Sequence, residues 1–245
     1  MKERKIWIAL TDYAEDGIGR YGNLIGNLYT YFLPGININK IRKILIRFSE
    51  EPDYFDLYQA DDQIWAIIKT FDYISFNKSD HFRKCELLSD YVFECLRAFF
   101  TKFNIDLKDL GTAHKQIKEV DFKLKIVICG APKQNRSKNV VAMVGAEYFL
   151  DYSLISINFY FKESDSNKVI TLCKSYPTSF IYSRLFSNAK WIDNSNFLIL
   201  NETKEINISI NIDGNVSVEY HPISRDIESL KKEIKYLTQE LSFQL

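Results

Sequence analysis

Residues 206–220 read INISINIDGNVSVEY, in which two runs of alternating apolar and polar residues flank the segment 213–215. Alternation with a period of two is typical of a strand with one buried face, and an Asp-Gly step between two such runs predicts a β-hairpin. A loop of residues 213 and 214 alone would place Ile212 opposite Asn215, whereas a loop of residues 213–215 places Ile212 opposite Val216. We therefore expect the three-residue loop. The residues expected on the buried face are Ile208, Ile210, Ile212, Val216 and Val218.

Further strands are expected on the N-terminal side of this hairpin. Residues 122–131, 140–149, 153–161 and 168–174 are rich in β-branched and aromatic residues, and Pro, Asn, Asp and Ser clusters separate them. Residues 197–200 form another short apolar run. The second half of the chain is therefore predicted to consist mostly of strands joined as hairpins.

Two amphipathic helices are predicted, at residues 80–104 and at residues 224–243. In the first, apolar residues recur at steps of three and four behind Asp80, a residue type that caps helix N-termini. The second begins at Ser224 and has heptad spacing from Ile227 to Leu241, sustained for little more than two repeats. We expect that helix to pack on the sheet, with an oligomerising structural module as the alternative.

The N-terminal part is expected to mix strands with shorter segments of other kinds. Residues 6–10 and 41–48 read as strands, and residues 64–76 favour a strand because of their β-branched and aromatic content. Residues 11–23 are polar and contain glycines, so we expect a loop there.

The order of these elements predicts an α+β fold. A weaker helix at residues 107–120, interrupted by Gly111, completes a first half that mixes helices and strands. Strands connected as hairpins predict a largely antiparallel sheet. We expect a single α+β domain over residues 1–245. If the chain is subdivided, a mixed, helix-rich part at 1–120 would precede a β-rich part with the C-terminal helix at 121–245.

Charge and composition narrow the functional classes. The chain has 32 basic and 32 acidic residues and a formal net charge of zero, whereas a protein that neutralises many phosphates is expected to show a basic excess. No apolar stretch approaches the roughly 20 residues that span a bilayer. The four cysteines lie in apolar runs without CxxC spacing, so we expect reduced thiols. We therefore expect a cytoplasmic protein that binds neither nucleic acid nor membrane.

Residues 17–22 read GIGRYG and match the G-x-G-x-x-G pattern of dinucleotide-binding units. In such a unit the glycine turn follows the strand at once and brings backbone N–H groups to a pyrophosphate. Here residues 11–16 separate the predicted strand from Gly17, and the rest of the chain lacks alternating strand–helix units. We interpret Gly17–Gly22 as part of a surface loop and expect no cofactor, with a nucleotide-binding enzyme as the alternative.

The sequence contains no recognisable catalytic or metal-binding motif. His81, His114 and His221 are far apart, and each lacks a second ligand at helical spacing. No G-x-S-x-G nucleophile elbow occurs. We predict no catalytic and no metal-binding residue, and an enzyme with a site assembled from scattered residues is the alternative.

Residues 50–62 carry six acidic side chains and no basic one, interleaved with aromatic residues. Charges of one sign around exposed aromatics suit a protein interface, in which the aromatics anchor the partner and the charges steer it. A solvated acidic face above buried aromatics is the alternative. The candidate partner-binding residues are Glu50, Glu51, Asp53, Tyr54, Asp56, Tyr58, Asp61 and Asp62.

Three segments give the chain a family resemblance: the helix expected at 80–104, residues 126–133 (IVICGAPK) and residues 189–193 (AKWID). Over roughly residues 79–200 the chain resembles the cytoplasmic immunity proteins encoded beside bacterial polymorphic toxins. The resemblance implies a protein that binds one cognate toxin tightly and neutralises it, and it assigns no residue roles. The expected function is therefore protein binding, with a cognate toxin as the partner.

Overall fold

The computed structural model describes residues 5–11, 18–35, 40–177 and 184–242. The chain divides into two compact units, Met1–Leu124 and Lys125–Leu245. Most of the described helices belong to the first unit, and the second unit is mostly strand. This distribution confirms the predicted α+β class.

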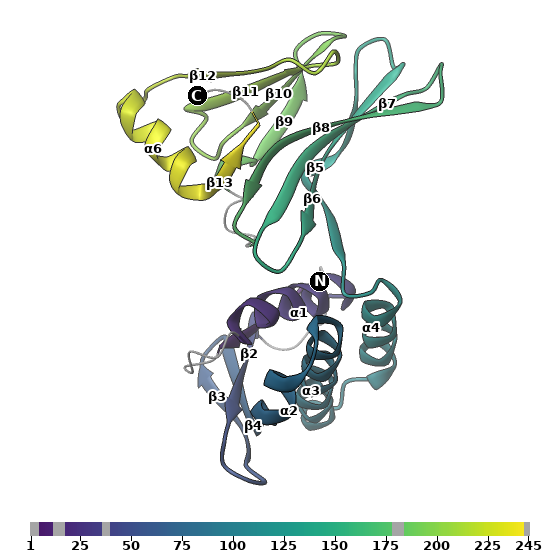
Figure 1. Cartoon of the computed structure of the whole chain (residues 1–245), viewed down its shortest axis with the longest axis vertical. Coiled ribbons are helices and arrows are strands. Elements are labelled where there is room, and N and C mark those ends of the chain that lie inside the picture. The colour runs from purple at the N-terminus through teal and green to yellow at the C-terminus, as the bar shows by residue number, and fades with distance from the viewer. Residues whose placement is uncertain (1–4, 12–17, 36–39, 178–183, 243–245) are drawn as a thin grey trace. The chain divides into compact units, whose positions relative to one another are not determined.

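Four strands form the sheet of the first unit: β1 (Trp7–Thr11), β2 (Lys43–Ser49), β3 (Phe55–Asp61) and β4 (Ile64–Thr70). Their order is β1-β2-β4-β3. β2 pairs in parallel with both β1 and β4, whereas β3 pairs antiparallel with β4. β3 therefore lies at an edge of a mixed sheet (Figure 1). The antiparallel character of the fold comes mainly from the second unit.

Four helices lie together beside this sheet: α1 (Ile18–Phe32), α2 (Tyr73–Lys78), α3 (His81–Lys102) and α4 (Leu107–Glu119) (Figure 1). The last three each begin behind an aspartate whose carboxylate accepts a hydrogen bond from a backbone N–H of the first turn. The two helices predicted in this region are confirmed as α3 and α4. α2 replaces the end of the strand predicted at 64–76.

Aromatic side chains fill the space between the sheet and α3. Trp65 of β4 packs edge-on against Phe99 and Phe103, with ring centroids 6.1 and 4.9 Å apart. Phe48 of β2 stacks on Tyr91 with ring centroids 5.1 Å apart. Because alternate residues of a strand point to opposite faces, these contacts identify the face of the sheet that α3 covers.

Helix α1 begins at Ile18, inside the segment 11–23 that was predicted to be a loop, and this prediction was wrong for its second half. Two glycines of the helix, Gly22 and Gly26, face strand β1. A Cβ atom on Gly26 would lie 2.7 Å from the carbonyl oxygen of Ile8, and one on Gly22 would lie 3.1 Å from a side chain of β1. Glycine at these positions therefore lets the helix approach the strand closely.

The second unit contains a five-stranded and a four-stranded sheet, with the orders β13-β8-β7-β6-β5 and β12-β11-β10-β9. The pairings from β6 to β8, from β9 to β12, and between β8 and β13 are antiparallel. All strands predicted in this half are confirmed, whereas β9 and β13 were not predicted. The strands are β5 (Leu124–Gln134), β6 (Val140–Tyr148), β7 (Ser153–Phe161), β8 (Ser166–Ser175), β9 (Asn188–Trp191), β10 (Asn196–Leu200), β11 (Ile206–Asn211), β12 (Val216–Tyr220) and β13 (Thr238–Leu241).

A small aromatic cluster joins the two sheets of this unit. The ring of Phe159, on β7, lies 5.7 Å from that of Trp191 and 6.3 Å from that of Phe197. Trp191 also donates a hydrogen bond from Nε1 to the carbonyl oxygen of Lys133, on β5, at 2.8 Å. The inward faces of both sheets thus share one core.

The predicted hairpin forms, but its register differs from the predicted one by two residues. Ile210 pairs with Val216 and Ile208 pairs with Val218, which leaves residues 212–214 as the loop. The loop has the expected length, and apolar residues still face apolar residues. Its position along the chain was predicted wrongly.

Gly214 explains where the loop lies. Its φ is +100°, and a three-residue hairpin loop needs a positive φ at its third position, which glycine adopts without strain. The side chain of Asn211 also accepts a hydrogen bond from the backbone N–H of Asp213 at 2.7 Å. Ile208 and Ile210 are buried as expected. The other three residues expected on that face, Ile212, Val216 and Val218, are only half-buried.

The C-terminal helix, α6 (Ile227–Leu237), is shorter than the predicted 224–243. Asp226 caps it in place of Ser224, because its carboxylate accepts a hydrogen bond from the backbone N–H of Ser229 at 2.7 Å. The chain then continues as β13, which pairs with β8. In this pairing, backbone groups of residues 238–241 form hydrogen bonds with β8. In the predicted helix they would have bonded within its last turns. The heptad residues Leu230, Ile234 and Leu237 are buried.

Candidate functional site

The acidic stretch at 50–62 surrounds the edge strand β3. Residues 50–54 connect β2 to β3, and residues 62 and 63 turn back into β4. Among the described strands, β3 has a neighbour on one side only, so one row of its backbone N–H and C=O groups faces outward. The structure therefore places the candidate residues at the open edge of the N-terminal sheet.

Five of the six candidate acidic residues form two groups. Glu50, Glu51 and Asp53 precede β3, whereas Asp61 and Asp62 lie at its other end, and all five are exposed. A strand of seven residues spans roughly 20 Å, which separates the two groups. The stretch is thus a strand with an acidic group at each end, and not one continuous acidic patch.

Two of these aspartates also shape the turns. Asp53 has a φ of 55°, a left-handed conformation that aspartate adopts more readily than most residues. The Oδ1 atom of Asp61 accepts a hydrogen bond from the backbone N–H of Asp62 at 2.6 Å. Part of the acidic composition therefore has a local structural cause.

The aromatic residues of the stretch differ in exposure. Tyr58 is half-buried, and its hydroxyl accepts a hydrogen bond from Nη1 of Arg47 at 3.4 Å. Asp56 is also half-buried. Tyr54 is 36% exposed and Phe55 is 50% exposed. Phe55, which was not among the candidate residues, is therefore the best-placed aromatic anchor on this edge.

An open groove of about 600 Å³ lies between β3 and α3. Two exposed apolar side chains, Phe55 and Leu107, line it together with the basic side chains of Lys69, Arg97 and Lys102. The groove thus combines an apolar surface with positive charge. Sequence reasoning missed it because its residues come from three separate segments of the chain.

Lys102 covers part of the open strand edge. Its Nζ atom donates a hydrogen bond to the carbonyl oxygen of Leu57 at 3.1 Å and lies 4.6 Å from the centroid of the Trp65 ring. A lysine at a strand edge discourages the pairing of a further strand. The outward row of β3 is therefore partly capped by a side chain of α3.

A second polar cluster joins α1, α3 and α4. Nδ1 of His114 lies 2.6 Å from the hydroxyl of Tyr29, and Nε2 lies 3.2 Å from Oδ1 of Asp90. The order carboxylate, imidazole, hydroxyl is the one that activates nucleophiles in many enzymes. Ser89, which is fully buried, has its hydroxyl 3.4 Å from the same Nδ1.

The environment of this cluster opposes nucleophilic chemistry. Tyr29 is fully buried, and burial raises the pKa of its hydroxyl above the ordinary value. Burial, followed by the charge of Lys118, lowers the pKa of His114, so the imidazole is neutral near pH 7. A neutral imidazole bridges the carboxylate and the hydroxyl, and the cluster holds three helices together.

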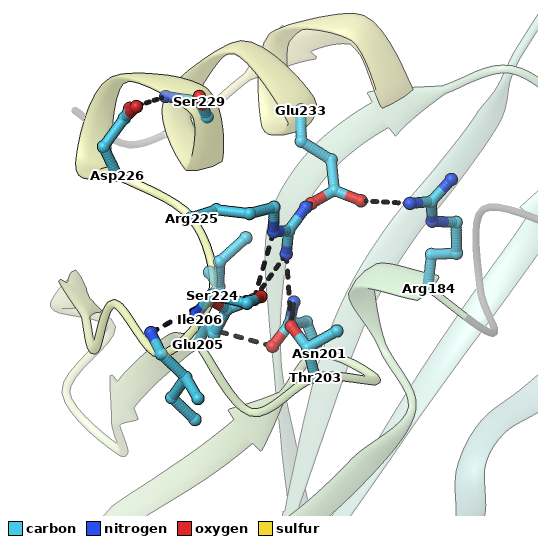
Figure 2. A network of polar contacts seen from close by, with 11 residues as sticks. Arg184, Asn201, Thr203, Glu205, Ile206, Ser224, Arg225, Asp226, Ser229 and Glu233 are labelled. Atoms are coloured by element: carbon cyan, nitrogen blue, oxygen red, sulfur yellow. Dashed lines mark hydrogen bonds and ion pairs between the residues drawn. The ribbon is translucent and has the colours of Figure 1, made fainter.

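A dense polar network lies in the second unit and surrounds Glu205 (Figure 2). The carboxylate of Glu205 is buried and accepts hydrogen bonds from the backbone N–H groups of Ile223 and Ser224 at 3.1 and 2.9 Å. It also accepts two from Arg225, which in turn contacts Glu233 of α6. These bonds hold the pKa of Glu205 well below its usual range. The network ties the start of α6 to strand β11.

In the part of the chain that the structure describes, candidate cofactor and metal ligands are not brought together. Gly19 and Gly22 lie inside α1, and Gly17 lies outside the described residues. β1 is at a sheet edge, whereas a dinucleotide binds where the strand order reverses beside a central strand. Among the described residues, no group of three or more His, Cys, Asp or Glu could hold a metal ion. Burial raises the pKa of the Cys85 thiol to about 11 and of the other three thiols to about 12.

Comparison of the chain with family models, curated proteins and solved structures found no match. In the ranges that the structure covers, no helix is long and apolar enough to cross a membrane.

Proposed function

We propose that this chain is a protein-binding protein and that its interface is β3 with the acidic group at each end. One observation carries the proposal: β3 is an exposed edge strand, and two exposed aromatic rings lie at its start, that of Phe55, its first residue, and that of Tyr54 just before it. An aromatic side chain on an accessible surface is a typical anchor of an interface.

The partner that fits this edge has positive charge on either side of the strand contact. The exposed acidic groups before and after β3 would attract such a surface at long range and so speed association. Within this proposal the chain acts as an immunity protein, as the family resemblance implies. The partner is then a bacterial toxin with a basic cleft, which the acidic edge blocks.

Affinity capture from the native host, followed by binding kinetics with the captured partner, tests the proposal. The triple variant Asp53→Lys/Asp61→Lys/Asp62→Lys should slow association roughly tenfold or more and weaken its salt dependence. The control carries the same charge change at exposed positions of the second unit, Glu163→Lys/Glu202→Lys/Glu219→Lys.

A second pair of variants tests the aromatic anchor. Phe55→Ala should speed dissociation, whereas Tyr236→Ala, which removes a 77% exposed ring from α6, should not. If both the charge-reversed and the Phe55 variants are folded and bind the partner as the unmodified chain does, β3 is not the interface.

A further inference from the structure

The outward groups of β3 can be assigned from its register. Tyr54 accepts a backbone hydrogen bond from Thr70 at 2.9 Å, and in an antiparallel ladder such bonded positions alternate along the strand. Phe55, Leu57 and Gln59 therefore direct their N–H and C=O groups away from β4. The bond from Lys102 to the carbonyl of Leu57 agrees with this assignment.

The same residues direct their side chains toward the face that α3 covers. Phe55 stands opposite Lys69 of β4, and both line the groove beside α3. The wall of the groove on α3 contains Glu94, Arg97 and Thr101, spaced three and four residues apart and hence on one face of the helix. A strand added to β3 would lie next to this wall and would direct alternate side chains into the groove.

The charge of the groove selects the side chains that fit it. Arg97 forms an ion pair with Glu94. Lys69 and Lys102 have no carboxylate partner in the part of the chain that the structure describes, and their known contacts are to aromatic rings and to one carbonyl. The lining therefore has a positive surplus beside the apolar surfaces of Phe55 and Leu107.

From these contacts we infer that the groove receives an extended segment of the partner protein, which pairs with β3 as an added strand. Its groove-facing side chains alternate between apolar residues, which contact Phe55, and a carboxylate, which contacts Lys69 and Lys102. Backbone pairing supplies affinity and the alternate side chains supply specificity, as in other proteins that bind peptides by strand addition. This inference rests on the proposed function, since it names the segment that the same edge binds.

Lys102 exchanges partners in this mode of binding. In the free protein its ammonium covers the carbonyl of Leu57. An incoming backbone N–H takes over that carbonyl, and the carboxylate of the bound segment takes over the ammonium. The acidic side chain therefore releases the cap that otherwise discourages strand pairing.

Synthetic peptides test the inference on the full chain. The probe TITETIT places Ile, Glu and Ile at alternate positions, and the control TITKTIT differs only in its central residue. Nuclear magnetic resonance titration should show saturable shifts of the Phe55 and Leu57 amides with TITETIT, at an affinity at least roughly tenfold above that of TITKTIT. A TITETIT peptide with every backbone amide N-methylated should bind much more weakly, because it cannot donate a hydrogen bond to the strand in either orientation.

A variant with reversed charge in the groove provides a second test of the inference. The variant Lys69→Glu/Lys102→Glu should reverse the preference and bind TITKTIT more tightly than TITETIT. Equal affinities for both peptides, undiminished binding of the N-methylated peptide, or shifts confined to other residues would overturn the inference. If the peptides fail while the acidic triple variant still slows association with the native partner, strand addition is wrong and the proposed function stands.

Discussion

The guanidinium of Arg225 donates two hydrogen bonds to the buried carboxylate of Glu205, from Nε at 3.1 Å and from Nη2 at 2.7 Å. The side chain of Glu205 is only 1% exposed, so its charge has no access to water. A buried charge that loses its partner is strongly destabilising, whereas an exposed ion pair contributes little. The join between α6 and the sheet therefore depends on this pair.

Acid should weaken the fold through Glu205. Its folded-state pKa lies far below the ordinary value of about 4.3, so the unfolded chain binds a proton first as the pH falls. The stabilisation is fully present above about pH 4.3 and is lost progressively below it. Urea unfolding between about pH 3 and pH 7 should show this loss, and Glu205→Gln should reduce the pH dependence.

An exposed ion pair provides the control for the contribution of the Arg225–Glu205 pair to stability. Arg83 and Glu86 form an ion pair at 3.0 Å on the surface of α3. Arg225→Ala should lower the melting temperature by several degrees, and Arg83→Ala should leave it nearly unchanged. Equal melting temperatures of the two variants would show that the network around Glu205 does not secure α6.

Two glycines of α1 should respond to alanine in opposite directions. A Cβ atom on Gly26 would lie 2.7 Å from a backbone carbonyl, whereas one on Gly19 would meet nothing within 4 Å. Gly26→Ala should therefore cost about 1–3 kcal/mol by overpacking. Gly19→Ala should stabilise the helix by roughly 0.5–1 kcal/mol, because alanine is the better helix former. Equilibrium unfolding of both variants checks the pair, and a destabilised Gly19→Ala would contradict the open surroundings of that position.

Gly22 and Gly26 show why helix α1 was not predicted from the sequence. Elements that depend on local patterns were predicted correctly, such as α3 with its apolar face and the alternating strands of the second unit. The reason for glycine at positions 22 and 26 is a contact with β1, which a pattern of neighbouring residues does not contain. A polar, glycine-bearing stretch therefore read as a loop where a helix forms.

The candidate site was predicted only in part for a similar reason. Sequence composition identified the acidic stretch but did not predict that a strand lies within it. The charged residues hide the alternating pattern of a strand, and an edge strand tolerates such charges on its exposed side. The basic residues of the groove belong to β4 and α3, so that only the fold brings them beside Phe55. The end of α6 was missed because β13 pairs with β8, more than 60 residues away in sequence.

The hairpin register has a direct mutational test. Ile210 is fully buried and paired with Val216, whereas Ile212 lies in the loop and is half-buried. Ile210→Asp should cost about 3 kcal/mol or more, because an unpaired carboxylate enters the core. Ile212→Asp should cost clearly less, although the two residues lie on the same face in the register predicted from the sequence. Equal losses of stability in urea unfolding would favour that other register.

Removing the amino group of Lys102 should expose the edge of β3. The residue caps the carbonyl of Leu57 and lies over Trp65, so Lys102→Ala leaves an outward acceptor uncovered beside the half-exposed ring of Phe55. An uncovered edge strand is a template for pairing with another chain. We expect the variant to self-associate at concentrations at which the unmodified chain does not, as measured by sedimentation velocity and light scattering. Lys115→Ala, which truncates a 78% exposed side chain on α4, should leave self-association unchanged.

Two further outcomes separate edge capping from a general loss of stability. Lys102→Arg retains a donor of similar reach, so it should restore the original association state. The cation–π contact that Lys102→Ala also removes accounts for about 0.5–1 kcal/mol, and a fall of that size in the free energy of unfolding is expected in the monomer. If Lys102→Ala and Lys115→Ala associate to the same extent, the contact with Leu57 does not protect the edge. In that case the inference that Lys102 leaves the carbonyl of Leu57 for a carboxylate of the bound segment would also be wrong.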